Sequence, residues 1–143
     1  MLKKLVFGLC IFCCSESFAD DKDLKYAEAL EKSQKEEKPL VVLISAKWCS
    51  SCSTMKSEVL EPMKKDGVFK DAVVTVVDVD ENPELVKKLY IVSEETKQPI
   101  TTLPQVVVFS TKKNNPKKYS WGAGRQSRPR IVELLERAFK NGK

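Results

Sequence analysis

The apolar residues of this chain form three short continuous runs, separated by polar segments with a different spacing. The runs cover 40–46, 73–79 and 105–110 and are dominated by Val, Ile and Leu. The first follows Pro39 and stops at Lys47. Short apolar runs between such boundaries are typical of strands buried on both faces. We therefore predict three central strands at these positions.

The segments before and after the run 40–46 have apolar residues at the spacing of a helix. Residues 21–38 are charged, with apolar side chains spaced three apart at Leu24, Ala27 and Leu30, which predicts an amphipathic helix capped by Asp21 or Asp23. After the run, apolar residues again recur at helical spacing. This second helix should be kinked by Pro62 and ended by Gly67.

The second half of the chain predicts two more helices and a hairpin. Asn82 is a good N-cap for a short helix through Tyr90, and the aperiodic stretch 91–102 is expected to be a loop. Residues 117–121 should return as an antiparallel partner of the third strand. Ser127 caps a last helix. Its apolar face is formed by Ile131, Leu134, Leu135, Ala138 and Phe139. This order predicts an α/β fold with a mixed central sheet and helices on both faces.

The N-terminal segment 1–19 differs from the rest of the chain and predicts a signal peptide. Lys3 and Lys4 precede a ten-residue apolar run, and small residues lead to a cleavage site after Ala19. A retained membrane span is the weaker alternative, because the run has about half the necessary length. A lipid anchor on one of the three cysteines of this segment, or a buried N-terminal element, are further alternatives. Cleavage would leave one domain, residues 20–143, exported to the periplasm.

Cleavage would also leave Cys49 and Cys52 as the only cysteines. A disulfide that encloses two residues restrains the unfolded chain little, so we predict a redox role for this pair rather than a structural one. The chain has no histidine, which excludes Ser-His-Asp and Cys-His nucleophiles. Two cysteines are too few for a structural zinc site, and we expect neither a metal nor a small-molecule cofactor.

The formal net charge is +5, and removal of the signal peptide would leave the chain only mildly basic. Positive charges gather near the C-terminus, at Lys112, Lys113, Lys117, Lys118, Arg125, Arg128 and Arg130. We interpret them as a solvated surface, with steering of acidic partners or contact with anionic lipid as the alternative. No aromatic residues are interleaved with them, so we expect no nucleic-acid binding.

The position of Cys49, between a buried strand and a helix, activates its sulfur. Free N–H groups at a helix N-terminus favour the thiolate over the thiol. Such a thiolate attacks a substrate disulfide and forms a mixed disulfide. Cys52, one helical turn on, can then attack Cys49 and release the reduced substrate.

Three motifs in this order resemble the thioredoxin superfamily, from about residue 38 to 139. They are Ala-Lys-Trp-Cys-Ser-Ser-Cys at 46–52, Val-Asp-Val-Asp-Glu-Asn-Pro at 77–83, and Leu-Pro at 103–104. The resemblance implies a thioredoxin-like fold and protein dithiol–disulfide oxidoreductase activity. The chain is thereby identified as a member of this superfamily.

The resemblance assigns roles to five residues. Cys49 is the nucleophile and Cys52 the resolving thiol. Pro104 is expected to follow a cis peptide bond and to pack against the disulfide, with an ordinary proline at a strand start as the alternative. The backbone of Leu103 and the side chain of Trp48 are expected to bind substrate.

The stretch 48–62 and the signal peptide resemble the exported thioredoxin-like proteins of the bacterial Dsb systems, such as the C-terminal domain of DsbD and the DsbH-like proteins. This implies a monomeric periplasmic reductase of protein disulfides that receives electrons from a membrane donor of the DsbD type. The absence of histidine between the cysteines also favours the reducing direction. The alternative is a thioredoxin-like metal-binding or cytochrome-assembly module without net redox turnover.

Four features depart from the superfamily pattern. Leu43 and Val76 replace a buried aspartate and its lysine partner, and Lys56 replaces a glutamate of the DsbD domain. Lys56 either favours a nearby thiolate or is a solvated surface residue. The stretch 91–102 contains an insertion, which either shapes the docking of partners or is a tolerated surface loop.

Overall fold

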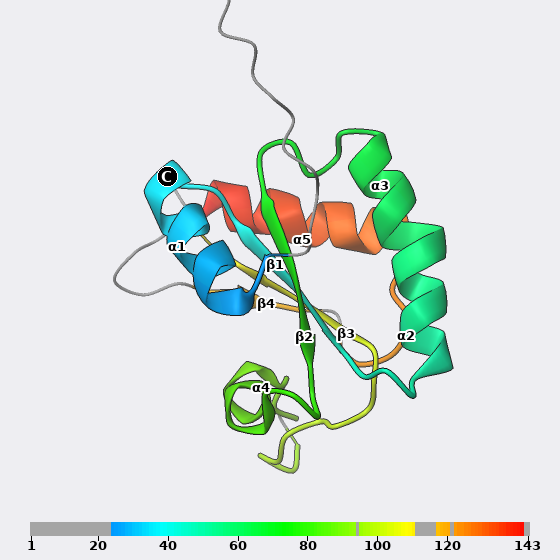
Figure 1. Ribbon diagram of the computed structural model, residues 1–143. Helices are drawn as coiled ribbons and strands as arrows, with labels where there is room; N and C mark the ends of the chain where they lie inside the picture. The colour runs from blue at the N-terminus through cyan, green and yellow to red at the C-terminus, as the bar shows by residue number, and fades with distance from the viewer. Residues whose placement is uncertain (1–23, 94, 111–116, 121, 142–143) are drawn as a thin grey trace, which may run out of the picture.

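The computed structural model describes residues 24–93, 95–110, 117–120 and 122–141 (Figure 1). The predicted signal peptide lies outside the described residues, as do both predicted caps of the first helix and most of the turn before the last strand. None of the helices in the described part is long and apolar enough to cross a membrane.

The elements alternate between helix and strand along most of the chain. In order they are α1 (Tyr26–Glu36), β1 (Leu40–Ser45), α2 (Ser50–Met55), the π-helical turn η1 (Lys56–Leu60), α3 (Glu61–Lys65), β2 (Val73–Asp78), α4 (Pro83–Leu89), β3 (Gln105–Phe109), β4 (Lys118–Tyr119) and α5 (Arg128–Lys140).

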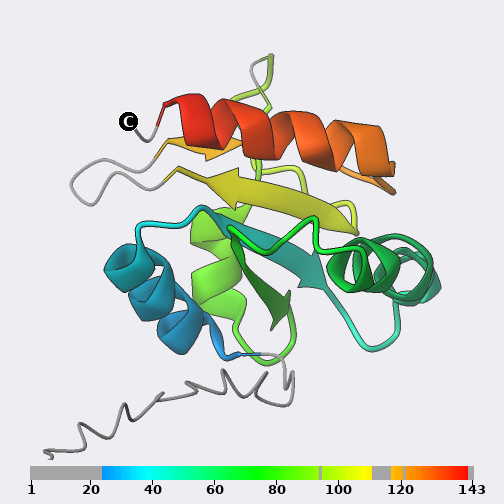
Figure 2. The same ribbon diagram turned by 90° about the horizontal axis from the view of Figure 1, so that it is seen from above.

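The strands form one sheet in the order β2-β1-β3-β4. β1 and β2 are parallel, whereas β1–β3 and β3–β4 are antiparallel. One apolar core lies between the sheet and α2, η1, α3 and α5, and a second lies between the opposite face and α1 and α4. Figure 2 shows α5 lying along β3 and β4. The predicted mixed sheet with helices on both faces is confirmed.

The strand β2 corrects one prediction. Its residues alternate between buried and half-buried, whereas the sequence predicts burial on both faces. The reason is the strand order, which places β2 at an edge of the sheet. Val74 and Val76 accordingly line a surface pocket as well as flanking the core.

The first helix also begins later than predicted. It starts at Tyr26, with Lys25 in the N-cap position and no side-chain cap, so the expectation of a cap at Asp21 or Asp23 was wrong. The backbone of Leu24 instead joins the sheet through an isolated parallel bridge to Thr75, whose hydroxyl donates to the Leu24 carbonyl at 2.6 Å.

The other helices follow the prediction more closely. Asn82 and Ser127 occupy the N-cap positions of α4 and α5, but neither side chain makes a capping hydrogen bond. The predicted apolar face of α5 is buried except for Phe139, which is 38% exposed near the end of the helix.

Pro62 explains the π-helical turn. In a regular α-helix its ring would clash with the carbonyl four residues earlier. The helix instead widens just before the proline, and the N–H of Glu61 donates to the carbonyl of Lys56, five residues back. The predicted kink is therefore a π turn within a continuous helix from 50 to 65. Gly67, at φ +73°, ends it as predicted.

Candidate active site

The two cysteines lie where β1 ends and α2 begins. Cys49 is the N-cap residue of α2, with an extended backbone, and Cys52 lies in its first turn. They form a disulfide, with the two sulfurs 2.07 Å and the two Cα atoms 5.3 Å apart. The sequence prediction that these thiols form a pair at a helix start is confirmed by this geometry.

Polar groups of the same turn surround the sulfur of Cys49. The backbone N–H of Cys52 donates to this sulfur at 3.2 Å, and the hydroxyl of Ser51 lies 3.4 Å from it. Cys49 is 8% exposed and Cys52 only 2%. The first sulfur is thus nearer to solvent and already has a donor that would stabilise a negative charge.

The Leu103–Pro104 peptide bond is cis, as the resemblance implies. Leu103 packs against a small cluster formed by Ala46, Cys49 and Cys52, so this loop contacts the disulfide. The carbonyl of Pro104 accepts from the N–H of Gly124 at 2.8 Å. Within the described residues, Leu103 makes no backbone–backbone hydrogen bond outside the regular helices and strands.

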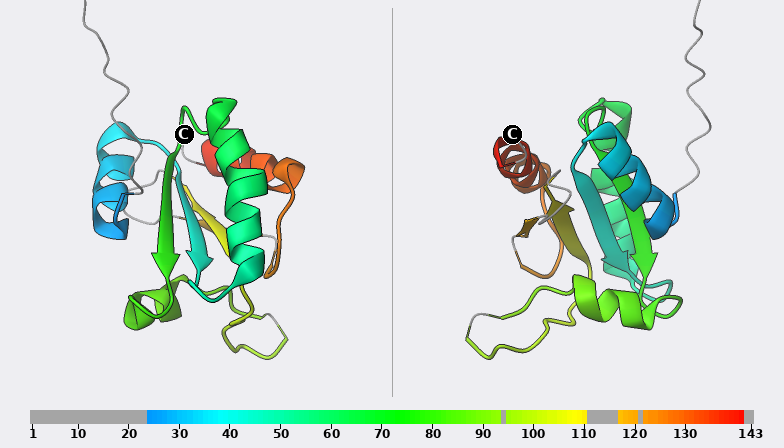
Figure 3. Two further views of the ribbon diagram at one scale, coloured as in Figure 1. Left: turned by 45° about the vertical axis from the view of Figure 1, so that its right-hand side comes forward. Right: turned by 90° about the vertical axis from the view of Figure 1, so that its left-hand side faces the viewer.

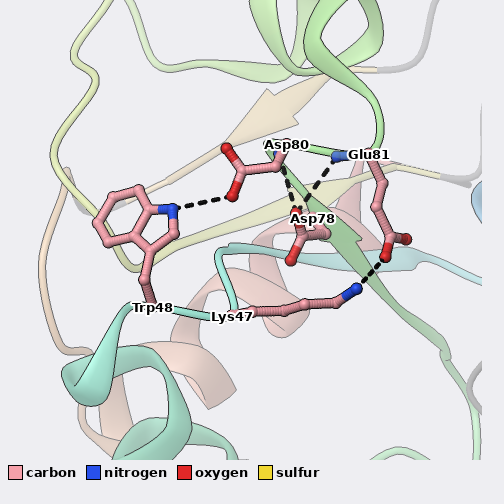
Figure 4. Close-up of polar contacts among 5 residues, drawn as sticks. All are labelled: Lys47, Trp48, Asp78, Asp80 and Glu81. Carbon is pink, nitrogen blue, oxygen red and sulfur yellow. Dashed lines mark hydrogen bonds and ion pairs between the residues drawn. The ribbon is translucent and has the colours of Figure 1, made fainter.

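Trp48 stands beside the cysteines and is 71% exposed. Its indole N–H donates to Asp80 at 2.8 Å, and the neighbouring Lys47 ammonium contacts Glu81 at 2.5 Å. Both acceptors lie in the loop after β2, so two side chains from the β1–α2 loop reach across to it (Figure 4). The hydrogen bond that Lys47 donates to Glu81, and then the negative charge of Glu81, raise the pKa of Lys47.

A third acidic residue shapes the loop that receives them. Asp78, the last residue of β2, accepts from the backbone N–H groups of Asp80 at 2.9 Å and Glu81 at 3.3 Å (Figure 4). From the sequence, these acidic residues were identified only as part of the motif at 77–83 that resembles the superfamily. Their contacts with Lys47 and Trp48 were not predicted.

The apolar replacements at Leu43 and Val76 are neighbours. The two residues are directly paired in the parallel β1–β2 register, and both pack into the core beneath α2 and α3. Leu43 is 1% exposed and Val76 is half-buried. A hydrophobic contact thus fills the place that the charged pair takes in the superfamily pattern, and no buried charge is left alone.

Lys56 lies on the π-helical turn, one turn after Cys52, and is half-buried. It lines a surface pocket of about 400 Å³ together with Leu60, Lys64, Phe69 and Val76. The structure therefore places its side chain along the edge of the sheet, beside β2.

The segment 91–102 is more ordered than the predicted loop. Val92 and Pro99 form an antiparallel bridge, and the N–H of Ile100 donates to the carbonyl of Ile91 at 2.7 Å. The segment extends from the end of the sheet at which β1 leads into α2 (Figure 3). It ends at Leu103, the residue that contacts the cysteines.

Gln105 is a site residue that the sequence reasoning missed. It is fully buried at the start of β3. Its side-chain oxygen accepts from the N–H of Ile91 at 3.3 Å, and its side-chain nitrogen donates to the carbonyls of Ile100 and Thr102. The available signal was a polar side chain directly after Pro104 and before three valines.

Polar side chains outside the cysteine site form ion pairs and hydrogen bonds. Within the ranges that the structure describes, no group of three or more Cys, His, Asp or Glu residues is placed to hold a metal ion. Several of the predicted solvated cations are engaged: Arg125 pairs with Glu58, Arg128 pairs with Asp66 at 2.5 Å, and Lys118 donates to the carbonyls of Leu89 and Tyr90.

Comparison with known proteins relates this site to one family. A family model described as thioredoxin-like matches residues 22–110. The fold is similar to a thioredoxin from Thermus thermophilus, with a TM-score of 0.62 and 23% identity over 82% of this chain and 85% of that one. Chloroplastic thioredoxin z gives a TM-score of 0.55 and 24% identity over 81% and 92%. No curated protein sequence matches the chain.

Proposed function

The chain belongs to the thioredoxin-like family, and on that premise we propose that it is a periplasmic reductase of protein disulfides. The observation that supports the chemistry is the Cys49–Cys52 disulfide at the start of a helix, with the N–H of Cys52 directed at the sulfur of Cys49. Together, fold and cysteine pair indicate a thiol–disulfide oxidoreductase.

The reaction begins from the dithiol. The thiolate of Cys49 attacks one sulfur of a substrate disulfide, which breaks that bond and forms a mixed disulfide. The first substrate sulfur leaves as a thiolate and takes up a proton. Cys52 then loses its proton and attacks the sulfur of Cys49. The Cys49–Cys52 disulfide forms, the second substrate thiol is released, and two electrons have passed to the substrate.

Substrate binding is assigned to the residues that flank this disulfide. The N–H and C=O of Leu103 would pair with an extended peptide, as at an exposed strand edge. Leu103 packs against the cysteine cluster, and the exposed indole of Trp48 offers an apolar contact.

Export and electron supply are the further parts of the proposal. The charged start, apolar run and small residues before Ala19 support export. Turnover in the periplasm requires a dithiol donor, and we propose a membrane protein of the DsbD type. The reduction potential of the disulfide determines whether such a protein reduces or oxidises its substrates. This potential is about −270 mV for thioredoxin and about −120 mV for DsbA, although both use a Cys-x-x-Cys pair.

Two measurements test this function. The Cys52→Ser variant should trap partner proteins as mixed disulfides on Cys49, whereas Cys49→Ser should trap none. In alkylation of the reduced protein, the midpoint for Cys49 should lie below the value of about 8.5 for free cysteine. Failure to trap any partner, or a midpoint at the free value, would contradict the enzymatic function.

A second experiment tests whether the protein reduces or oxidises its substrates. Equilibration of the Cys49–Cys52 disulfide with glutathione should give a potential near the thioredoxin value. A potential near that of DsbA would instead make the protein an oxidase of protein thiols.

A further inference from the structure

The fully buried amide of Gln105 connects the two segments that border the disulfide. We propose that Gln105 is a positioning residue, which fastens the segment 91–102 to the cis-proline loop and so makes that segment part of the surface that binds protein substrates. The inference rests on the proposed function and names its substrate class, an extended polypeptide around a disulfide rather than a small disulfide.

The hydrogen bonds of Gln105 account for its whole amide. Its oxygen accepts from Ile91, where the segment begins, and its nitrogen donates to Ile100 and Thr102, where the segment ends. Because the Gln105 side chain is fully buried, breaking these bonds would leave its amide without partners. One side chain therefore closes the segment at its base.

A second polar side chain holds the same base from β4. The ammonium of Lys118 donates to the carbonyls of Leu89, at 2.9 Å, and Tyr90, the residue before the segment. Burial lowers the pKa of Lys118. Partial burial removes water from the Lys118 ammonium, which is unfavourable. Its carbonyl partners lie at the C-terminus of α4, however, where the helix dipole favours a positive charge.

The position of Gln105 connects the two ends of the segment 91–102 to the Cys49–Cys52 disulfide. It directly follows Pro104, and its partner Thr102 directly precedes Leu103, which packs on the cysteines. Movement of the segment would thus shift the backbone that is proposed to pair with substrate. Such a shift would weaken the pairing of an extended peptide with this backbone, which raises KM.

The segment also presents an apolar side chain to solvent. Val92 is 53% exposed and forms the bridge with Pro99, and Trp48, in the loop between β1 and α2, is 71% exposed. The segment extends from the end of the sheet at which β1 leads into α2 (Figure 3). A small disulfide reaches only the sulfurs. A polypeptide that extends along Leu103 can contact the segment as well, so only the longer substrate depends on its position.

The test separates the two substrate classes. Gln105→Met keeps the length of the side chain but removes all three hydrogen bonds. With dithiothreitol as reductant, KM for insulin should rise about tenfold, equivalent to about 1.4 kcal/mol, while kcat for insulin and the rate with oxidised glutathione stay within about twofold. Thr75→Val, which removes a buried hydrogen bond on β2, is the control for general destabilisation and should change neither.

A shortened segment gives an independent measurement should Gln105→Met not fold. Deleting 93–98 together with Pro99→Gly joins Val92 to position 99, and the existing Ile91–Ile100 hydrogen bond becomes that of a four-residue turn. This variant keeps every bond of Gln105 and should also raise KM for insulin alone. Adding Gln105→Met to it should have little further effect, because no extended segment remains to be held.

Two results would overturn the inference. One is an unchanged KM for insulin in both Gln105→Met and the shortened variant, and the other is an equal loss with insulin and oxidised glutathione. A wild-type protein that reduces neither substrate would overturn the proposed function, and this inference with it.

Discussion

The apolar pair Leu43–Val76 makes a quantitative prediction about the core. Introducing the acidic residue of the superfamily pattern, as Leu43→Asp, would place a carboxyl group at a position that is 1% exposed. Loss of the buried leucine costs about 2–5 kcal/mol, and an unpaired buried polar group adds about 1–3 kcal/mol. Because such domains are stable by only about 5–15 kcal/mol, the variant should be severely destabilised or unfolded.

The partner substitution should behave differently. Val76 is half-buried on the edge strand β2, so in Val76→Lys the aliphatic stem can cover the core while the ammonium reaches water. We expect this single change to cost about 1 kcal/mol or less. In the double variant the ammonium faces the carboxylate across the β1–β2 register, and coupling of about 1–3 kcal/mol should recover part of the loss.

Urea denaturation of the oxidised form of all four proteins measures this cycle. The double variant should be more stable than Leu43→Asp but still less stable than the wild type by about 1–4 kcal/mol, since a hydrophobic pair usually exceeds a buried ion pair. A Leu43→Asp protein within 1 kcal/mol of wild type, or a double variant no more stable than it, would refute this account of the core.

Three further predictions concern side chains that donate hydrogen bonds to backbone carbonyls, each measured as the free energy of unfolding in urea. Lys118→Met removes two hydrogen bonds to α4 and should cost about 1–3 kcal/mol. Burial lowers the pKa of Lys118, so between that pKa and about 10.4 the unfolded chain binds more protons than the folded chain. The wild type should therefore gain stability relative to Lys118→Met as pH rises through this window. A stability difference between the two proteins that does not change with pH would contradict this prediction. Thr75→Val should cost about 1 kcal/mol by releasing Leu24, and a neutral effect would show that this bridge is dispensable. Ser33→Ala should cost a similar amount, because the Ser33 hydroxyl donates to the Lys38 carbonyl at 2.6 Å after α1, and an unchanged midpoint would count against it.

The features that the sequence predicted depend on neighbouring residues. Each central strand lies in a short, mostly apolar run, and the position of Cys49 between a strand and a helix follows from two adjacent patterns. The cis bond before Pro104 followed from the family resemblance rather than from periodicity, because a proline before a strand is also compatible with a trans bond.

The features that were missed depend on residues far apart in the chain. The half-burial of β2 follows from its place at the edge of the sheet, which no local pattern contains. Gln105 bonds to Ile91, fourteen residues earlier, and this contact exists only after the segment between them closes on itself. Asn82 has a good capping side chain, yet the loop before α4 is held by Asp78 instead.

The two loops beside the cysteines are held by contacts of different strength, and salt should distinguish them. The Lys47–Glu81 pair is exposed, with side chains 79% and 57% accessible, so its contribution to stability is small and is screened further at 1 M salt, where the Debye length is about 3 Å. The bonds of Gln105 are buried and uncharged. The stability loss of Glu81→Gln should therefore disappear between 0.1 and 1 M NaCl, while that of Gln105→Met should persist. A salt-independent effect at Glu81 would show that the loop carrying Trp48 is held as firmly as the segment 91–102, and the selectivity of the site could then not be assigned to one side.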